Sequence, residues 1–279
     1  MSVHASSATM MPTTMPTLAE AEFQRFRDLI YRIAGIHLAD SKRLLVEGRL
    51  QRRLRATGIA TFIDYFRVVT NAQGADELQQ MVDALTTNET SFFRESVHFD
   101  LLARLAAEAH RVGRRFAVWS AAASTGEEIY SIAFVLAKTL GIENDWQVRG
   151  TDICTRVLEV ARVGRYAKTR IANLPAPYLN YIPPVDGNTV AVRDDIRRHV
   201  DFAHLNLNET LPPQVTRVPL IFVRNVMIYF DHDTKRRVVE RLLDRLEPGG
   251  HIVVGLAETL NGLTDRVEPV GQSAYRLVR

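Results

Sequence analysis

The sequence is short of several features that define common protein classes. Its 279 residues include a single cysteine, Cys154, so no disulfide can form within the chain, and this composition fits a reducing compartment such as the cytoplasm. Cys154 precedes an ordinary helical pattern without a nearby histidine pair, and we interpret it as an inert thiol. The longest apolar run, Val218–Phe230, is interrupted by Arg224 and Asn225, which argues against a transmembrane helix.

The chain also lacks the glycine-rich motifs that bind nucleotide phosphates. Neither G-x-G-x-x-G nor G-x-x-x-x-G-K-[ST] occurs in it, and these motifs form the phosphate cradles of dinucleotide and nucleoside-triphosphate sites. The net charge of +3 is too modest to indicate a nucleic-acid partner. A nucleoside ligand without phosphates remains compatible with these absences.

What is present divides into two parts after a polar start. Residues 1–17 are rich in Ser, Thr, Met and Pro, and we expect a disordered tail that is too polar for a signal peptide. Apolar residues then recur at helical spacing, for example Phe23, Phe26 and Ile30, and glycines interrupt the pattern. We predict an all-helical N-terminal domain of about four short helices at 18–90.

From Arg114 onward, short apolar segments alternate with helical patterns. The expected strands are FAVWS, WQVRGTD, HVDFAHL, LIFVRNV and HIVVG, and the helices between them are 126–140, 155–163 and 233–246. This alternation predicts an α/β domain with a parallel, doubly wound sheet. We expect a linker helix at 91–112, the α/β domain at 113–279 and a small antiparallel β-subdomain inserted at about 180–200.

The segment Trp119–Phe134, WSAAASTGEEIYSIAF, is the most concentrated chemical signal. A buried strand leads into a turn of small residues, Ala121–Thr125, and a helix begins near Gly126. Glu127 and Glu128 follow where free amide groups and the positive end of the helix dipole collect. Two carboxylates there would repel a phosphate. The segment therefore favours a ligand that is cationic or rich in hydroxyls and amines.

Polar residues also follow the later strands. Ligands bind beyond the carboxyl ends of the strands in open parallel sheets, and Asp152, Asn206 and Arg224 follow the second, third and fourth expected strands. An acid after the second strand is the usual partner of ribose hydroxyls. Asp152 could alternatively cap the helix that starts at Thr155, and both interpretations stay open.

The segment Leu85–Phe99, LTTNETSFFRESVHF, sets polar groups among aromatic residues. Capping of a helix start would explain Thr86 or Asn88. Capping does not explain Arg94, because a guanidinium beside two phenylalanines needs a partner. A ligand carboxylate would provide a bidentate one.

Four motifs in series resemble one known family. TTNETSFFRE, WSAAASTGEEIYSIA, TDICTRVLEVARVGRY and FVRNVMIYFD are similar, in order and spacing, to motifs of the chemotaxis receptor methyltransferases, the CheR family, and the resemblance covers about Ala21 to Val278. It implies a Rossmann-like S-adenosylmethionine-dependent methyltransferase domain with a mostly parallel seven-stranded sheet. The implied activity is methyl transfer from S-adenosyl-L-methionine to glutamate side chains of chemoreceptors, yielding glutamate methyl esters and S-adenosyl-L-homocysteine.

The resemblance also implies site residues. The cofactor contacts are Asn88, Thr90, Arg94, Glu128, Asp152, Asn206, Leu207, Arg224 and Asn225, and the catalytic residues are Arg94 and Tyr229. Arg94 would bind the cofactor carboxylate and Asp152 the ribose, whereas Tyr229 would orient the acceptor or pack on the sulfonium. Closure of the core after a buried strand is the alternative role of Tyr229. No metal is expected.

Basic side chains concentrate on one side of the helix expected within Ser41–Arg55. They are Lys42, Arg49, Arg52, Arg53 and Arg55, and KRLLVEGRLQRRLR is similar to the basic receptor-facing helix of the family. A solvated face without a partner is the alternative. The resemblance favours docking of the acidic coiled-coil methylation region of a chemoreceptor, because opposite charges raise the association rate.

The chain departs from the family in two places. YIPPVDGNTVAV carries prolines where some members have a glycine-rich loop that binds a receptor pentapeptide, so we expect no tether binding here. GLAETL stands where the family usually has Gly-His-Ser-Glu, and Glu258 is kept. We expect a cytoplasmic monomer that neither inserts into membranes nor binds nucleic acid.

Two alternatives to receptor methylation stay open. One is methylation of a different acceptor, although the Asp/Asn-Pro-Pro-aromatic and Pro-Cys motifs of nucleic-acid methyltransferases are absent. The other is a non-catalytic module that senses S-adenosylmethionine and docks by its basic helix. The presence of Arg224, Asn225 and Tyr229 argues against the second alternative.

Overall fold

The computed structural model describes residues 15–212 and 216–278, so most of the tail expected at 1–17 lies outside the described residues. The chain divides into two units. The first comprises the residues up to Ile33 and His37–Thr86, and the second comprises Ala34–Ile36 and the residues from Thr87 onward. The division at Thr86 lies four residues before the end that the sequence predicted for the helical domain.

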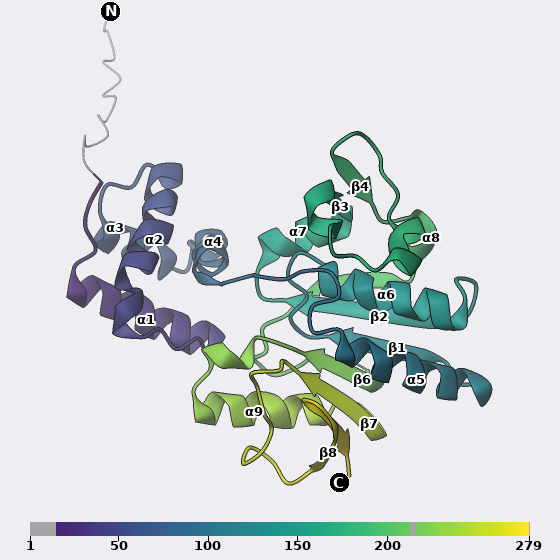
Figure 1. Cartoon of the computed structure of the whole chain (residues 1–279). Helices are drawn as coiled ribbons and strands as arrows, with labels where there is room; N and C mark the ends of the chain where they lie inside the picture. Colours follow the sequence, from purple (N-terminus) through teal and green to yellow (C-terminus); the bar gives the residue numbers. More distant parts are fainter. Residues whose placement is uncertain (1–14, 213–215, 279) are drawn as a thin grey trace, which may run out of the picture. The chain divides into compact units, whose positions relative to one another are not determined.

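The first unit is helical, as the sequence predicts (Figure 1). Its elements are α1 (Glu20–Ala34), the short 3-10 turn η1 (Asp40–Lys42), α2 (Arg43–Thr57), α3 (Phe62–Val69) and α4 (Ala75–Leu85). The ring of Phe26 packs on those of Phe62, Tyr65 and Phe66, which joins α1 to α3 in the core. Helix α2 ends at Gly58, whose φ of 72° is a left-handed conformation that glycine adopts without strain.

The second unit is built on a seven-stranded sheet in the order β5-β2-β1-β6-β7-β9-β8. Its strands are β1 (Phe116–Ser120), β2 (Trp146–Asp152), β5 (Val200–His204), β6 (Val218–Val223), β7 (Leu246–Val254), β8 (Val267–Gly271) and β9 (Ala274–Leu277). The strands from β5 to β7 run parallel, and β9 runs antiparallel to both β7 and β8. The α/β class and the mostly parallel sheet are therefore confirmed.

Helices cover both faces of this sheet (Figure 1). They are α5 (Val97–Arg111), α6 (Glu127–Leu140), α7 (Thr155–Val163), α8 (Asp194–Arg197) and α9 (His232–Leu243), with 3-10 turns η2 (Lys168–Ile171), η3 (Ala176–Tyr181) and η4 (Met227–Tyr229). Successive side chains of a strand point to opposite faces. Leu220 and Phe222 of β6 accordingly lie in the core with α5 and α6, whereas Ile221 and Val223 lie in the core with α9. Among the described residues, every helix is too short or too polar to cross a lipid bilayer.

Two details differ from the sequence prediction. The small antiparallel sheet pairs β3 (Arg165–Ala167) with β4 (Thr189–Ala191), so one of its strands lies outside the expected range of 180–200. The expected linker helix at 91–112 is only α5, and its apolar face packs in the same core as α6 within the second unit. Strands of three residues carry too little alternation to be recognised, which explains the first difference.

Candidate functional site

The strands β2, β1, β6 and β7 end at one edge of the sheet, and Asp152 is the last residue of β2. Its Oδ2 accepts the backbone N–H of Ser124 (2.8 Å) and its Oδ1 accepts that of Cys154 (2.9 Å). Cys154 occupies the N-cap position of α7, so the Asp152 carboxylate joins the turn after β1 to the start of α7. Asp152 thus lies at the carboxyl end of β2, the place where an acid binds ribose hydroxyls in folds of this type.

The turn after β1 is compact because of its small residues. Gly126 has a φ of 96°, and a Cβ there would lie 2.8 Å from the Tyr166 hydroxyl and 2.9 Å from the Cβ of Ala161. Glu127 is fully buried and pairs with Arg170 (Nε–Oε1 3.0 Å). Glu127 is therefore committed to the protein and does not face a ligand.

Glu128 lies beside Glu127 but in a different environment. Its Oε1 accepts a hydrogen bond from Ser120 Oγ (2.7 Å), and its Oε2 lies 3.2 Å from Nη1 of Arg224. Burial raises the pKa of the Glu128 carboxyl, and the charge of Arg224 opposes that effect. This carboxylate at the start of α6 suits a cationic ligand group.

The segment 88–94 is tied to the turn after β1 through its backbone. The carbonyl of Asn88 accepts a hydrogen bond from Ser124 Oγ (2.9 Å), and the carbonyl of Thr90 accepts one from Arg170 Nη2 (3.1 Å). The first bond holds Asn88 next to the small-residue turn, and the second ties Thr90 to η2, whose Arg170 also pairs with Glu127. Two segments that are separate in the sequence, 88–94 and the turn after β1, are thus joined by a hydrogen bond.

Arg94 has protein partners and remains accessible. Its Nη1 donates to the carbonyl of Glu89 (3.0 Å), its Nε lies 4.0 Å from Oε1 of Glu95, and 39% of its side chain is exposed. A guanidinium carries five N–H donors. Arg94 therefore keeps donors with which it could bind a ligand carboxylate.

Arg224, a predicted cofactor contact, is buried between acidic side chains. Its side chain is only 1% exposed, and it lies between Glu95 (Nη2–Oε2 3.0 Å) and Glu128. The centre of the guanidinium is 5.9 Å from the ring centroids of Phe99 and Phe222. Protein groups therefore surround the Arg224 side chain, and its contact with the cofactor stays a prediction.

Asn225 is held by two carboxylates. Its backbone N–H donates to Glu258 Oε2 (2.8 Å), and its Nδ2 donates to Glu95 Oε1 (3.2 Å). The Glu258 carboxylate also accepts the N–H groups of Gly255 (2.7 Å) and Ile228 (3.2 Å). Glu258, for which the sequence indicated only a role in the fold, therefore shapes the loops after β6 and β7.

The remaining predicted residues lie after β5 and in η4. Asn206 uses both ends of its amide in its own loop, donating to Glu209 Oε1 (3.0 Å) and accepting the N–H of Asn208 (3.0 Å). Leu207 beside it is buried. Tyr229 is half-buried in η4, four residues after Asn225.

Glu95 is the site residue that sequence reasoning missed. Burial raises its pKa, but the hydrogen bond from Asn225 and the charge of Arg224 outweigh burial, so the net effect lowers the pKa. Glu95 stands inside the quoted motif TTNETSFFRE, next to Arg94. Its position beside Arg94 was the one sign in the sequence that Glu95 could belong to the site. Its partners Arg224 and Asn225 could not be inferred, because they lie about 130 residues away in the chain.

Left-handed backbone conformations gather around the same residues. Of the five non-glycine residues with positive φ in the described part of the chain, four lie here, namely Phe93 (φ 54°), Glu95 (φ 56°), Ser124 (φ 49°) and Asn225 (φ 58°), and the fifth, Ser273 (φ 51°), lies in the turn between β8 and β9. Each such conformation costs about 1–3 kcal/mol and persists where the surroundings over-determine it, which is common at functional sites. This strain supports a binding site at the end of the sheet.

The five basic residues predicted for docking separate into two groups. Arg49 donates to the carbonyls of Leu85 (2.8 Å) and Thr86 (3.0 Å), and Arg53 pairs with Glu77 (Nη2–Oε2 2.7 Å). These two side chains hold α2 to α4 and to the residue after it, and their part in docking stays a prediction. Lys42, Arg52 and Arg55 are exposed and form no ion pair with a described residue.

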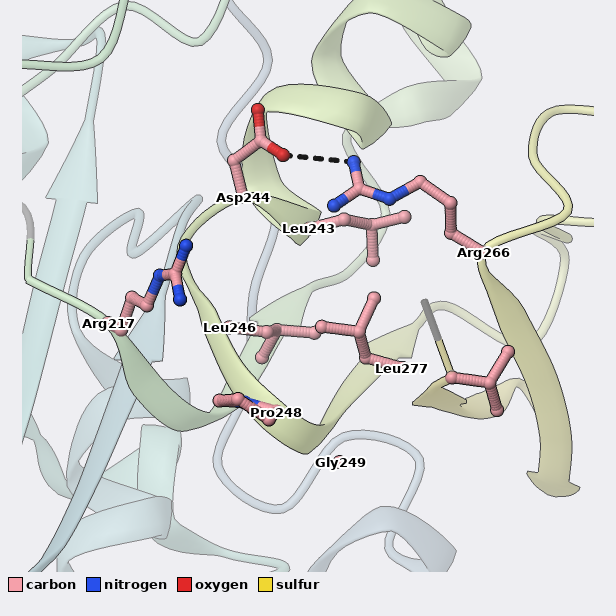
Figure 2. Close-up of a pocket in the computed structure, with 9 residues that line it drawn as sticks. Arg217, Leu243, Asp244, Leu246, Pro248, Gly249, Arg266 and Leu277 are labelled. Carbon is pink, nitrogen blue, oxygen red and sulfur yellow. Dashed lines mark ion pairs between the residues drawn. The ribbon is translucent and has the colours of Figure 1, made fainter.

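A separate hollow lies at the opposite, amino-terminal ends of β6 and β7 (Figure 2). It is lined by Arg217, Leu243, Asp244, Leu246, Pro248, Gly249, Arg266, Leu277 and Val278. Arg266 pairs there with Asp244 (2.9 Å). None of the predicted site residues lines this hollow. Within the described ranges, no three His, Cys, Asp or Glu side chains are placed to hold a metal ion.

Two family models and several curated proteins match the sequence of this chain. Residues 21–86 match the family described as "CheR methyltransferase, all-alpha domain", and residues 88–276 match "CheR methyltransferase, SAM binding domain". The chemotaxis protein methyltransferase of Escherichia coli (strain K12) is 43% identical over 281 residues, covering 98% of this chain and 96% of that protein. Chemotaxis protein methyltransferase 2 of Pseudomonas aeruginosa is 40% identical, with coverages of 95% and 99%.

Solved structures show a more distant likeness. The N-methyltransferase NodS from Bradyrhizobium japonicum WM9, in complex with S-adenosyl-L-homocysteine, is 16% identical and has a TM-score of 0.40. The match covers 77% of this chain and 96% of that chain. At this TM-score the likeness carries no information on the acceptor.

Proposed function

Because this chain belongs to the CheR family of S-adenosylmethionine-dependent chemotaxis methyltransferases, we propose that its methyl acceptors are glutamate side chains of chemoreceptors. The product would be a glutamate methyl ester. The observation that supports the proposal most is that Asp152 at the end of β2 and Glu128 at the start of α6 both bind residues of the turn and strand β1, while Arg94 keeps 39% of its side chain exposed.

These side chains fit the chemistry of S-adenosylmethionine. The donors that Arg94 keeps match a carboxylate, and the Glu128 carboxylate matches an ammonium group. Asp152 matches ribose hydroxyls, and the loop with Asn206 and Leu207 would border the adenine. The backbone carbonyl of Asn88 is held beside the turn after β1, and that of Thr90 is bound by Arg170.

The reaction asks for alignment rather than proton transfer. When bound, the cofactor supplies an electrophilic methyl group on a sulfonium. A glutamate side chain has a pKa of ~4.3, so the acceptor oxygen is already ionised at neutral pH and needs no general base. The residues of the chain would bind, orient and exclude water. Tyr229, which lies in η4 four residues after Asn225, is the residue that we propose orients the acceptor carboxylate.

Docking of the acceptor would use exposed cations of α2 and of the 3-10 turn before it. Lys42 of η1 and Arg52 and Arg55 of α2 present positive charge, and Leu44 of α2 has 72% of its surface exposed. An acidic amphipathic helix complements such a surface in both charge and polarity. We propose the acidic coiled-coil methylation region of a chemoreceptor as this partner, a monomeric state for the chain, and no binding of a receptor pentapeptide.

Two measurements test the proposal. Arg94→Ala and Asp152→Ala should each weaken S-adenosylhomocysteine binding about tenfold or more in titration calorimetry, whereas Arg111→Ala, on the exposed side of α5, should leave it unchanged. Transfer of tritiated methyl groups to a receptor cytoplasmic fragment should give label that alkali releases, as an ester requires. Cofactor binding without any transfer would instead favour a non-catalytic sensing module, and alkali-stable label would favour a different acceptor.

A further inference from the structure

Glu95 joins three segments around the site. Its Oε2 accepts hydrogen bonds from Arg224 Nη2 (3.0 Å) and the backbone N–H of Leu256 (3.2 Å), and its Oε1 accepts one from Asn225 Nδ2 (3.2 Å). Arg224 and Asn225 follow β6, Leu256 follows β7, and Glu95 precedes α5. Only 14% of the Glu95 side chain is exposed. The carboxylate therefore acts on protein groups and not on solvent.

The bond between Glu95 and Asn225 decides which end of the Asn225 amide faces outward. An ionised carboxylate only accepts hydrogen bonds, so it must meet the NH2 end of the amide. The Asn225 main chain is itself fixed, with a φ of 58° and its N–H on Glu258 (2.8 Å). Gly255 leaves room for this arrangement, because a Cβ there would lie 2.5 Å from Nδ2 of Asn225. Oδ1 of Asn225 is consequently directed away from Glu95.

We propose that Glu95 is a positioning residue that turns the Asn225 amide so that its carbonyl oxygen, a hydrogen-bond acceptor, faces the cofactor. This inference rests on the proposed placement of the cofactor against Asn225. S-adenosylmethionine carries an ammonium group and a sulfonium, and both favour an acceptor over an NH2 group. Glu95 does not touch the cofactor and acts through Asn225, while Arg224 balances its charge.

A double-mutant cycle on the full chain tests this inference. Glu95→Gln keeps the shape of the side chain but can offer an NH2 group to Asn225, so the amide is no longer held in one orientation. Glu95→Gln and Asn225→Ala should each weaken S-adenosylhomocysteine binding about tenfold in calorimetry. In the Asn225→Ala background, Glu95→Gln should add less than about twofold, because residues that act as a unit are not additive. Glu108→Gln, an exposed acid on α5, is the matched control and should bind normally.

Each other outcome has a definite meaning. Normal binding by Glu95→Gln with weakened binding by Asn225→Ala overturns the role of Glu95 and leaves the proposed cofactor site intact. Normal binding by Asn225→Ala overturns the placement of the cofactor and this inference with it. Additive losses also overturn the inference, because Glu95 would then act independently of Asn225. If Glu95→Gln does not fold, as judged by thermal melting, Glu95→Asp takes its place with the same expected losses, since its shorter side chain cannot reach Asn225.

Discussion

Each unit places an arginine against glutamate away from solvent, and the two pairs are built differently. In the first unit Arg53 meets one carboxylate, Glu77, through two hydrogen bonds of 2.9 and 2.7 Å. In the second unit Arg224 is divided between Glu95 and Glu128, and its Nη1 forms no hydrogen bond despite lying 3.2 Å from Glu128. The first pair is matched one to one, whereas the second leaves one arginine to neutralise two acids.

The backbone conformation also differs between the two pairs, because left-handed φ angles of non-glycine residues occur only around the second. Among the described residues of the first unit, no non-glycine residue has a positive φ. In the second unit, Glu95, which pairs with Arg224, has a φ of 56°, and Asn225, which donates a hydrogen bond to Glu95, has a φ of 58°. Strain of this kind persists where function requires it. The comparison indicates that Arg53 and Glu77 join helices of the first unit, whereas Arg224 and its acids hold loops with a strained backbone, which supports the proposed cofactor site.

The largest expected effect follows from removing Arg224. In Arg224→Met two half-buried carboxylates lose their counter-charge, which should destabilise the second unit by about 3 kcal/mol and weaken S-adenosylhomocysteine binding by about two orders of magnitude. Urea unfolding and calorimetry measure the two quantities. Equal losses in Arg236→Met, an exposed arginine of α9, would show that the effect is not specific to this pair.

Breaking the pair in the first unit should affect stability alone. Glu77→Gln turns an NH2 group toward Arg53 and should cost about 2 kcal/mol, the usual range for a hydrogen bond to a charged group. Cofactor affinity should stay within twofold of the unchanged chain, because the proposed cofactor residues lie in the second unit. Thermal melting and calorimetry test this, with Asp76→Asn on the exposed side of α4 as the control. A tenfold loss of cofactor affinity would contradict the division of roles.

Charge reversal on the exposed side of α2 should leave both pairs intact and change only docking. In Arg52→Glu with Arg55→Glu, the KM for a receptor fragment should rise about fivefold at low salt, and the difference should shrink as salt screens the charges. Stability should change by less than about 0.5 kcal/mol. Steady-state kinetics over a salt series gives the measurement, and Arg236→Glu serves as the control. An unchanged KM would favour a solvated face without a partner.

The smallest expected effect is a loss of stability in acid. His98 is buried against Gln272, and burial together with the charge of Arg224 lowers its pKa below 6.5. The unfolded chain therefore binds the proton more readily, so the stability present above pH 6.5 is lost as the pH falls. Glu95, with a pKa below 4.5, adds a second loss of the same sign below pH 4.5.

Thermal melting between pH 7 and pH 5 tests the first of these losses. The melting temperature of the second unit should fall by about 3 °C. His98→Gln should make the curve less steep between these two values, because only His251 then remains of the two histidines in this unit whose pKa burial lowers. A wild-type curve that is already flat would rule out the contribution of His98.

Sequence patterns predicted the fold well where the periodicity was long. The strand at Phe116–Ser120 and the helix at Thr155–Val163 have the predicted bounds, because buried strands and amphipathic helices leave strong patterns over several residues. The three-residue strands β3 and β4 left no such pattern. The positive φ of Phe93 and Glu95 was also beyond prediction, because these side chains have no intrinsic preference for that conformation.

The residues of the candidate site could be predicted from the sequence, but their hydrogen-bond and ion-pair partners could not. The residues after the strands could be named because parallel strands end at one edge, and their roles toward the cofactor stay predictions. The burial of Arg224 and the internal bonds of Arg49 could not be foreseen, because each depends on partners far away in the chain. Local sequence carries residue type and period, whereas such partners are set by the packing of distant segments.

By itself, therefore, the sequence determined the two-part organisation, the α/β sheet, and the family with its cofactor, because these follow from periodicity and from motifs in series. Only the tertiary structure decided which charges are paired. It placed Glu95 against Arg224 and Asn225 and brought Glu258 to the same loop. The physical reason is that a buried charge takes its partner from whatever segments the fold brings within hydrogen-bond distance, and chain order does not reveal which segments those are.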